Sequence, residues 1–213
     1  MADKKGLLVL VLAALVTGVS FALPNFKLSA GIGGFGGIST SQDIYFKGGG
    51  GYGLGSINVG GYAFFDATYL ELSLGVSGGP NYLSLWDSSN SGDIPRYDLS
   101  KTNFSIGLLV KYPFKTTEKL SLFPLLGINY MLAFLVEGEG EKYDEPNDFS
   151  EFWLEIGAGM DYSFTQNIYL RFTPLLGFRL PTKYEKDLME RRDGYTERAA
   201  ISVTARLAVG FRF

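Results

Sequence analysis

The chain has 213 residues, the size of one domain, and its formal charge of −3 is too small and of the wrong sign for a nucleic-acid-binding protein. It contains no Cys and no His, which excludes disulfides, thiol chemistry and histidine-dependent proton transfer. Gly is abundant, with 28 residues, as are Phe and Tyr, with 17 and 13. A narrow β-barrel in lipid uses both kinds, since aromatic side chains favour membrane interfaces and Gly fits a cramped interior.

The first residues have the three parts of a secretory signal peptide. Lys4 and Lys5 are positively charged, residues 7–16 form an apolar run, and Ser20 and Ala22 are small residues before a cleavage point. An uncleaved anchor is disfavoured because a membrane-spanning helix needs roughly 17–25 apolar residues. We expect residues 1–22 to be a cleaved signal peptide and residues 23–213 to form one barrel domain.

The rest of the chain alternates between apolar and polar residues, as strands do when the two faces of a sheet meet different surroundings. The final stretch is the clearest, since the odd positions from Ala199 to Phe213 are all apolar. Four further stretches alternate clearly and three do so weakly. With the final stretch they make eight, residues 26–32, 57–65, 68–76, 102–112, 120–136, 152–164, 168–180 and 199–213. Residues 120–136 carry no charge, but Pro124 and Gly127 favour a strand over a transmembrane helix.

The connections between these stretches alternate in length. Residues 65–67, 113–118 and 165–167 are short, whereas residues 34–51, 77–101, 137–151 and 181–198 are long and polar. Short periplasmic turns and long extracellular loops are the pattern of bacterial outer-membrane barrels. The predicted fold class is therefore all-β, a closed antiparallel transmembrane β-barrel of eight strands, since an open edge in lipid would leave backbone groups unpaired.

The apolar face could meet either lipid or the interior of a soluble, lipocalin-like barrel. In the five clear strands this face carries no charged residue. A soluble exterior would tolerate many charges, whereas one Arg or Lys in mid-membrane costs about 2–4 kcal/mol. We therefore expect the apolar face to meet lipid and the polar face to line the lumen.

The final strand resembles the C-terminal signal that the outer-membrane assembly machinery recognises, through Val209, Phe211 and Phe213. The strand spacing, with residues 69–72 (YLEL) and 123–127 (FPLLG), is similar to that of OmpA/OmpX-type barrels. The resemblance implies an outer-membrane location, lipid as the surroundings and the assembly machinery as a partner. It departs from OmpA itself because nothing follows the last strand here, so no periplasmic peptidoglycan-binding domain is expected.

The lumen of an eight-stranded barrel is just wide enough for its own side chains. The inward positions carry charges of both signs, which we expect to pair with each other because buried charges need partners; they are Glu71, Lys111, Glu155, Asp161, Arg171, Arg179, Arg206 and Arg212. The prediction is a plugged polar interior. The alternatives are a narrow or gated ion path and an OmpW-like conduit for small hydrophobic molecules.

Catalysis is not expected, because the barrel enzymes of the outer membrane (phospholipase, lipid A acyltransferase and deacylase, omptin-type protease) depend on a His. Residues 31–36 match the dinucleotide pattern G-x-G-x-x-G, but no helix is predicted after them, so no cofactor is expected. The third long loop is acidic (Glu137, Glu139, Glu141, Asp144, Glu145, Asp148 and Glu151). Divalent cations favour such clusters, but a solvated loop is the favoured interpretation and no metal site is assigned.

The second long loop contains Tyr82, Leu85 and Trp86 among polar residues. Exposed aromatic residues on a loop are candidate contacts for a partner, and they also serve as anchors at a membrane interface. The sequence thus favours a structural or surface-interaction protein, adhesin-like, whose long loops contact a ligand on a host or other cell surface.

Overall fold

The computed structural model describes residues 27–46, 51–86, 96–138, 141–142, 144–180, 195–197 and 200–213. Its wall consists of eight long strands: β1 (Leu28–Phe46), β2 (Gly51–Ala67), β3 (Leu70–Trp86), β4 (Arg96–Lys111), β6 (Leu120–Gly138), β8 (Glu151–Ser163), β9 (Ile168–Leu180) and β11 (Ala200–Arg212). The shorter elements are β5 (Phe114–Lys115), β7 (Glu141–Lys142), the 3-10 turn η1 (Pro146–Phe149) and β10 (Tyr195–Glu197). Within the described part of the chain, no helical segment has the length and apolar character of a membrane span.

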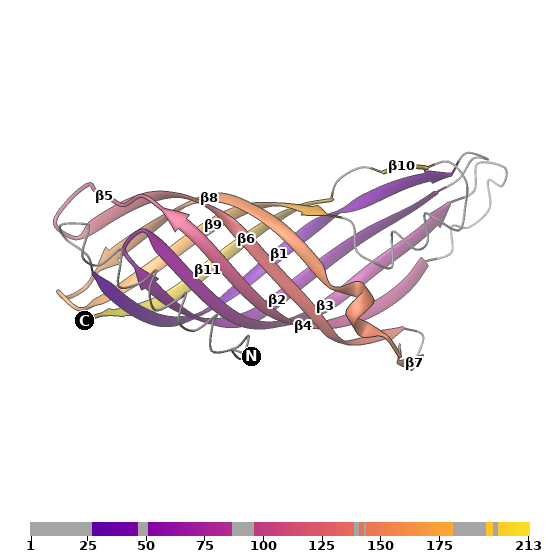
Figure 1. The fold of residues 1–213 in the computed structure, drawn as a ribbon, viewed down its shortest axis with the longest axis horizontal. Coiled ribbons are helices and arrows are strands. Elements are labelled where there is room, and N and C mark those ends of the chain that lie inside the picture. Colours follow the sequence, from indigo (N-terminus) through magenta and orange to yellow (C-terminus); the bar gives the residue numbers. More distant parts are fainter. Residues whose placement is uncertain are drawn as a thin grey trace, which may run out of the picture.

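The sheet closes on itself. Each long strand pairs antiparallel with its neighbour in the sequence, and β1 pairs with both β2 and β11 (Figure 1). The backbone amide of Phe213 donates to the carbonyl of Leu28, so the last strand ends beside the start of the first. The predicted closed antiparallel barrel of eight strands is confirmed, and closure leaves no open edge among the long strands.

The two faces of the wall differ as the alternation predicts. In β9, Phe172, Leu176 and Phe178 are exposed on the outside, whereas Arg171 and Arg179 are buried inside. Exposed Leu, Ile, Val and Phe side chains occupy the outer face of every long strand and form a belt. A protein in water rarely exposes more than a few hundred Å² of continuous apolar surface, so the outer face is suited to lipid.

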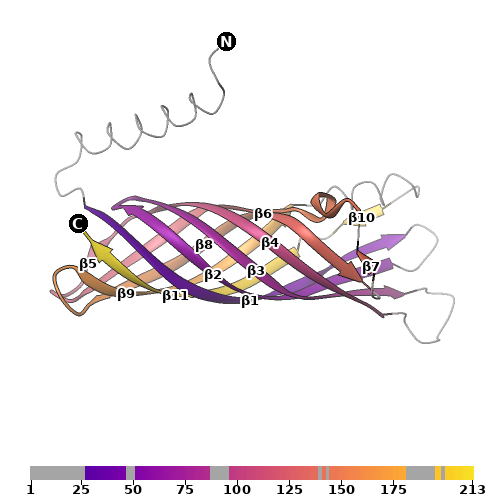
Figure 2. The same ribbon diagram turned by 90° about the horizontal axis from the view of Figure 1, so that it is seen from below.

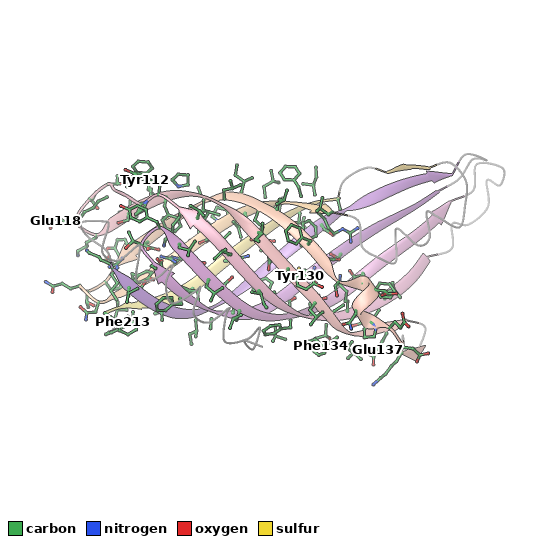
Figure 3. The ribbon with its side chains drawn as sticks, in the orientation of Figure 1. Tyr112, Glu118, Tyr130, Phe134, Glu137 and Phe213 are labelled. Atoms are coloured by element: carbon green, nitrogen blue, oxygen red, sulfur yellow. The ribbon has the colours of Figure 1, made fainter. Side chains whose placement is uncertain are left out.

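Aromatic side chains gather toward both ends of this belt. Figure 3 shows Tyr112 and Phe213 near one end, with the charged Glu118 beyond them, and Tyr130 and Phe134 toward the other end. Aromatic girdles at the two interfaces are typical of barrels in the outer membrane.

Strands β1 to β4 are much longer than predicted, and β6 is longer by two residues. Residues 34–46 and 51 are strand, not part of a first long loop, and residues 77–86 and 96–101 are strand, not part of a second. Those loop predictions were wrong because the strands continue past the apolar belt, where outward residues are no longer regularly apolar. Residues 120–136 are confirmed as a strand, within β6.

The wall is consequently higher on one side than on the other. Strands β1 to β4 and β6 have 16 to 19 residues, whereas β8, β9 and β11 have 13 each. Figures 1 and 2 show the long strands projecting at the end opposite the short turns. A strand needs only about 9–11 residues to cross a bilayer, so the excess of the long strands lies beyond the apolar belt.

Inward Gly residues make room for aromatic rings on the neighbouring strand. Gly31 is paired in register with Phe64, Gly159 with Phe123, and Gly210 with Tyr169. A Cβ added to these Gly residues would lie 2.5, 2.2 and 2.2 Å from ring carbons. Each ring therefore occupies the space that a side chain on the opposite strand would take.

We expect Gly159→Ala to lower the free energy of unfolding by about 1–3 kcal/mol, the usual effect of overpacking, because the new methyl group must displace the Phe123 ring. The matched control is Gly36→Ala, since a Cβ at Gly36 has no neighbour within 4 Å. Urea unfolding in lipid vesicles, followed by the loss of the compact band on a gel, measures both variants. Equal midpoints for the two would contradict the packing argument.

Candidate functional site

The most buried charge in the lumen is the guanidinium of Arg171, with 1% exposure. Its Nε and Nη2 donate to the two carboxylate oxygens of Asp161 at 2.7 and 2.8 Å. Nη1 donates to Glu71 Oε2 at 2.5 Å, and Nη2 also donates to Asp66 Oδ2 at 2.6 Å. Lys111 Nζ donates to the same Asp66 oxygen. Two cations and three carboxylates thus form one buried network.

Three aromatic rings surround this network. The guanidinium carbon of Arg171 lies 4.8 Å from the ring centre of Phe64 and 5.2 Å from the ring centres of Phe123 and Tyr169. Lys111 Nζ lies 4.7 Å from the centre of the Phe123 ring. The electron-rich ring faces attract the cations and cover part of the network, so its ion pairs are partly shielded from water.

This Arg171 layer, defined as Arg171, Lys111, Asp66, Glu71, Asp161 and the rings of Phe64, Phe123 and Tyr169, draws side chains from β2, β3, β4, β6, β8 and β9. The remaining long strands, β1 and β11, supply the Gly residues on which Phe64 and Tyr169 pack. One interior layer therefore contacts all eight long strands.

An apolar layer lies next along the axis. Leu109, Leu125 and Leu175 pack with Phe123 and are all buried. Their position follows from register, because Leu125 and Leu175 are both opposite Gly157, between Asp161 and Glu155 on the inner face of β8. This leucine layer (Leu109, Leu125, Leu175) has no polar side-chain atom to conduct ions.

Beyond the leucine layer, charged pairs resume. Arg206 Nη2 donates to the Glu155 oxygens at 2.8 and 3.1 Å, and Asn129 Nδ2 donates to Glu155 Oε1 at 3.1 Å. Arg206 and Glu155 line a cavity of about 40 Å³ together with Trp153 and Asn58. A water needs about 10–15 Å³ of such space, so the cavity holds only a few waters.

Among the described residues, the outermost buried ion pairs on this side centre on Glu151. Lys101 Nζ donates to Glu151 Oε1, as does Arg179 Nη1 at 3.1 Å, and Trp153 Nε1 donates to Glu151 Oε2 at 2.9 Å. All three charged groups are buried.

At the short-turn end the lumen widens into a vestibule of about 1000 Å³, defined by residues that include Lys27, Asp66, Glu118, Ser163 and Arg212. The inner wall of the vestibule is the Arg171 layer. The interior is thus open to this end and stops at the buried network.

The structure brings together seven of the eight charges predicted for the lumen. Glu71, Lys111, Asp161 and Arg171 share one network, Glu155 pairs with Arg206, and Arg179 pairs with Glu151. Arg212 differs, since its recorded polar partner is Ser163 Oγ at 2.8 Å and not a carboxylate.

Sequence reasoning missed three charged members of the interior. Asp66 was predicted to lie in a turn, and Lys101 and Glu151 in loops, but all three are inward and buried. The signal was present, because Asp66 has the same parity as Tyr62 and Phe64, Lys101 as Asn103, and Glu151 as Trp153.

The predicted loop contacts Tyr82, Leu85 and Trp86 lie in strand β3, so their assignment to a loop was wrong. The backbone of β3 continues to pair with β4 there, through Tyr82 opposite Asp98. The side chains of these three residues lie outside the described part of the structure.

Of the acidic loop residues, Glu151 is in the lumen, whereas Glu137, Asp144, Glu145 and Asp148 are at least partly exposed. Glu139 and the side chain of Glu141 lie outside the described residues. Among the described side chains, no group of three or more acidic residues is arranged to hold a metal ion.

The family model described as "Outer membrane protein beta-barrel domain" matches residues 7–188. Comparison with curated protein sequences gives no match. Among solved structures, the chain is similar to the outer membrane protein OprG from Pseudomonas aeruginosa, with 12% identity, a TM-score of 0.48 and coverage of 88% of this chain and 96% of that one.

It is also similar to Ail, the attachment invasion locus protein of Yersinia pestis, with 14% identity, a TM-score of 0.36 and coverage of 89% and 100%. The outer membrane protease OmpT from Escherichia coli is similar with 10% identity, a TM-score of 0.44 and coverage of 90% and 99%. At such identities these likenesses concern the fold alone.

Replacing Arg171 with Met leaves Asp66, Glu71 and Asp161 with Lys111 as their only cation in the layer. We expect a loss of about 3–5 kcal/mol of unfolding free energy, the usual cost of removing one partner of a buried ion pair. Urea unfolding in lipid vesicles, followed by tryptophan fluorescence, measures the loss. Adding Asp161→Asn to this variant is expected to recover part of it.

The control is Lys142→Met, because Lys142 is exposed and its nitrogen lies 3.6 Å from Glu137; exposed pairs contribute little. The interpretation of the Arg171 layer fails if Arg171→Met costs no more than this control.

Proposed function

We propose that this chain, which belongs to the outer-membrane β-barrel protein family, is a non-conducting scaffold that presents its extracellular end to other surfaces. The protein lies in the outer membrane, with lipid against the apolar belt. The short-turn end faces the periplasm, as in other bacterial barrels.

The filled lumen is the observation that carries the proposal. Arg171 is held by three carboxylates, and the leucine layer follows directly above it. An ion that crossed would have to break a buried network and then lose its hydration shell among leucines. Dry apolar constrictions of this kind stop conduction in channels.

A narrow channel is the second candidate. The cavity beside Arg206 and the periplasmic vestibule lie on either side of the Arg171 and leucine layers. Both layers lie between the two spaces, so a channel would require both to open together.

The strands that project from the barrel support the proposed role in contact with other surfaces. Strands β1 to β4 extend past the apolar belt on the side opposite the periplasmic turns. The segments that join them, residues 47–50 and 87–95, lie outside the described residues, and their sequences are composed mainly of small and polar residues. We propose that this end is adhesin-like and contacts a ligand on another cell.

We further propose that residues 1–22 are removed during export and that Val209, Phe211 and Phe213 form the assembly signal. All three of these side chains are exposed on the outer face at the periplasmic end of β11, where a recognition factor could reach them before the barrel closes. No enzymatic activity is proposed, because the chain has no His and the buried carboxylates are held by cations.

Single-channel recording in a planar bilayer tests the closed interior. The wild-type protein is expected to show no conductance steps above background. Leu125→Ser, which makes the leucine layer polar, combined with Arg171→Ser, which opens the network, is expected to produce steps.

The matched control is Leu126→Ser combined with Arg171→Ser, because Leu126 is the next residue on β6 but is 60% exposed on the outer face. This control is expected to conduct less than the Leu125 variant. Stable steps from the wild-type protein would reject the closed scaffold and favour the channel.

Adherence of bacteria that express the protein tests the proposed contact role. Replacing residues 87–95 by a Gly-Ser linker of equal length is expected to reduce binding to cultured cells and leave the barrel folded, since the paired residues of β3 and β4 stay intact. Surface display is checked by adding Lys142→Cys to both proteins, because the chain has no other Cys and Lys142 is exposed. Equal adherence at equal labelling with an impermeant maleimide would contradict a role for this segment.

A further inference from the structure

Arg212 is a lumen-facing cation without a carboxylate partner among the described residues. Its Nη1 donates to Ser163 Oγ at 2.8 Å, and its guanidinium carbon lies 4.3 Å from the centre of the Tyr169 ring. The other inward cations of the described lumen each pair with an acidic side chain; they are Lys101, Lys111, Arg171, Arg179 and Arg206. Arg212 is thus held in place while no described acidic side chain neutralises its charge.

Arg212 lines the periplasmic vestibule, where positive charge is in excess. Six cationic side chains line this cavity of about 1000 Å³, and three acidic ones do. Two of the acids, Asp66 and Asp161, are already bound by Arg171 and Lys111. The charges that remain on the lining are Lys27, Lys115, Lys119 and Arg212 against Glu118. Glu71, which also binds Arg171, leaves the buried network with one negative charge in excess, so four cations stand against two uncompensated negative charges.

This excess is local, because the chain as a whole carries a formal charge of −3. The barrel wall around the vestibule has a low dielectric constant and concentrates the field of the lining charges. An anion that enters the vestibule is therefore attracted more strongly than it would be by the same side chains on an open surface.

We propose that the periplasmic vestibule is a binding site for a phosphate group, centred on Arg212. The planar guanidinium binds two phosphate oxygens at once, and the Tyr169 ring and Ser163 hold it in one orientation. The lysines at the rim add charge without fixed geometry, which suits a multiply charged anion. The phosphate comes either from a free anion of the periplasm or from the headgroup of a phospholipid in the inner leaflet.

The test uses the full protein, extracted from outer membranes in a maltoside detergent, which carries no phosphate. Inorganic phosphate is titrated at constant ionic strength, with chloride as the balancing anion, because screening alone would change weak binding. Binding is read from the broadening of the phosphorus NMR line and from the rise in the unfolding temperature. Saturable binding is expected for the wild-type protein.

Arg212→Gln is expected to weaken binding by about tenfold or more, which corresponds to about 1.4 kcal/mol. Lys119 lies in an exposed turn, and Lys119→Gln is expected to weaken phosphate binding less. This variant tests the proposed site if the Arg212 variant does not fold. Lys142→Gln, at the extracellular end, is the matched control and is expected to leave affinity unchanged.

A parallel titration with soluble dihexanoyl phosphatidylglycerol separates the two sources. Tighter binding of this lipid than of inorganic phosphate assigns the site to a headgroup, and the reverse order assigns it to a free anion. The proposal is overturned if neither ligand saturates above the chloride control, or if the folded Arg212 and Lys119 variants both bind as the wild type does.

Discussion

Neutralisation of the buried Arg171 guanidinium constrains the rest of the barrel. Its carboxylate partners come from β2, β3 and β8, while Arg171 itself is on β9. A shift of one strand by a single residue would turn its charged side chain toward lipid, and a shift by two would separate the ion pairs. The network therefore fixes the relative register of strands that are not neighbours, which the backbone ladder alone does not do.

The same constraint accounts for the composition of the chain. An eight-stranded lumen has a fixed width, so a guanidinium surrounded by three rings fits only where the opposite strands lack side chains. Gly31, Gly159 and Gly210 provide that space directly across from Phe64, Phe123 and Tyr169. Buried ion pairs often add little stability compared with apolar side chains of equal volume. Their value here is the selection of one register and one closed barrel.

The alternation of the sequence was enough to predict the closed barrel, the apolar outer face and the inward position of most lumen charges. It failed where the outward residues stop being apolar, as around Lys101 and Glu151, which were placed in loops although their parity continues inside. Asp66 was placed in a turn although it lies between the apolar residues Phe65 and Ala67 and keeps the inward parity of Phe64. The sequence also contained no indication of a β-bulge between two of the strands. The pairing of β4 with β6 shifts between Thr102 and Asn103, and Ala133 and Val136 are both buried although they are three residues apart.

The sequence could not predict which charges pair with each other, because parity gives the face on which a side chain lies but not its height along the barrel axis. Glu155 was predicted to be inward, yet only the register shows that it pairs with Arg206 on β11 while Asp161, six residues later on the same face, binds Arg171. The separation of the interior into layers is therefore a property of strand tilt and closure. It could not be derived from any one strand.

Inward cations are paired differently at the two ends of the lumen, and the extent of their burial explains the difference. At the extracellular side the long strands β1 to β4 continue beyond the Glu151 group. Lys101 and Arg179 are buried there and require a carboxylate. At the periplasmic side the strands end in short turns, and Arg212 is only partly buried. Water can solvate its charge, so no acidic partner is required. Arg212 can thus lack an acidic partner at the periplasmic rim, and that rim is where an anionic ligand has access.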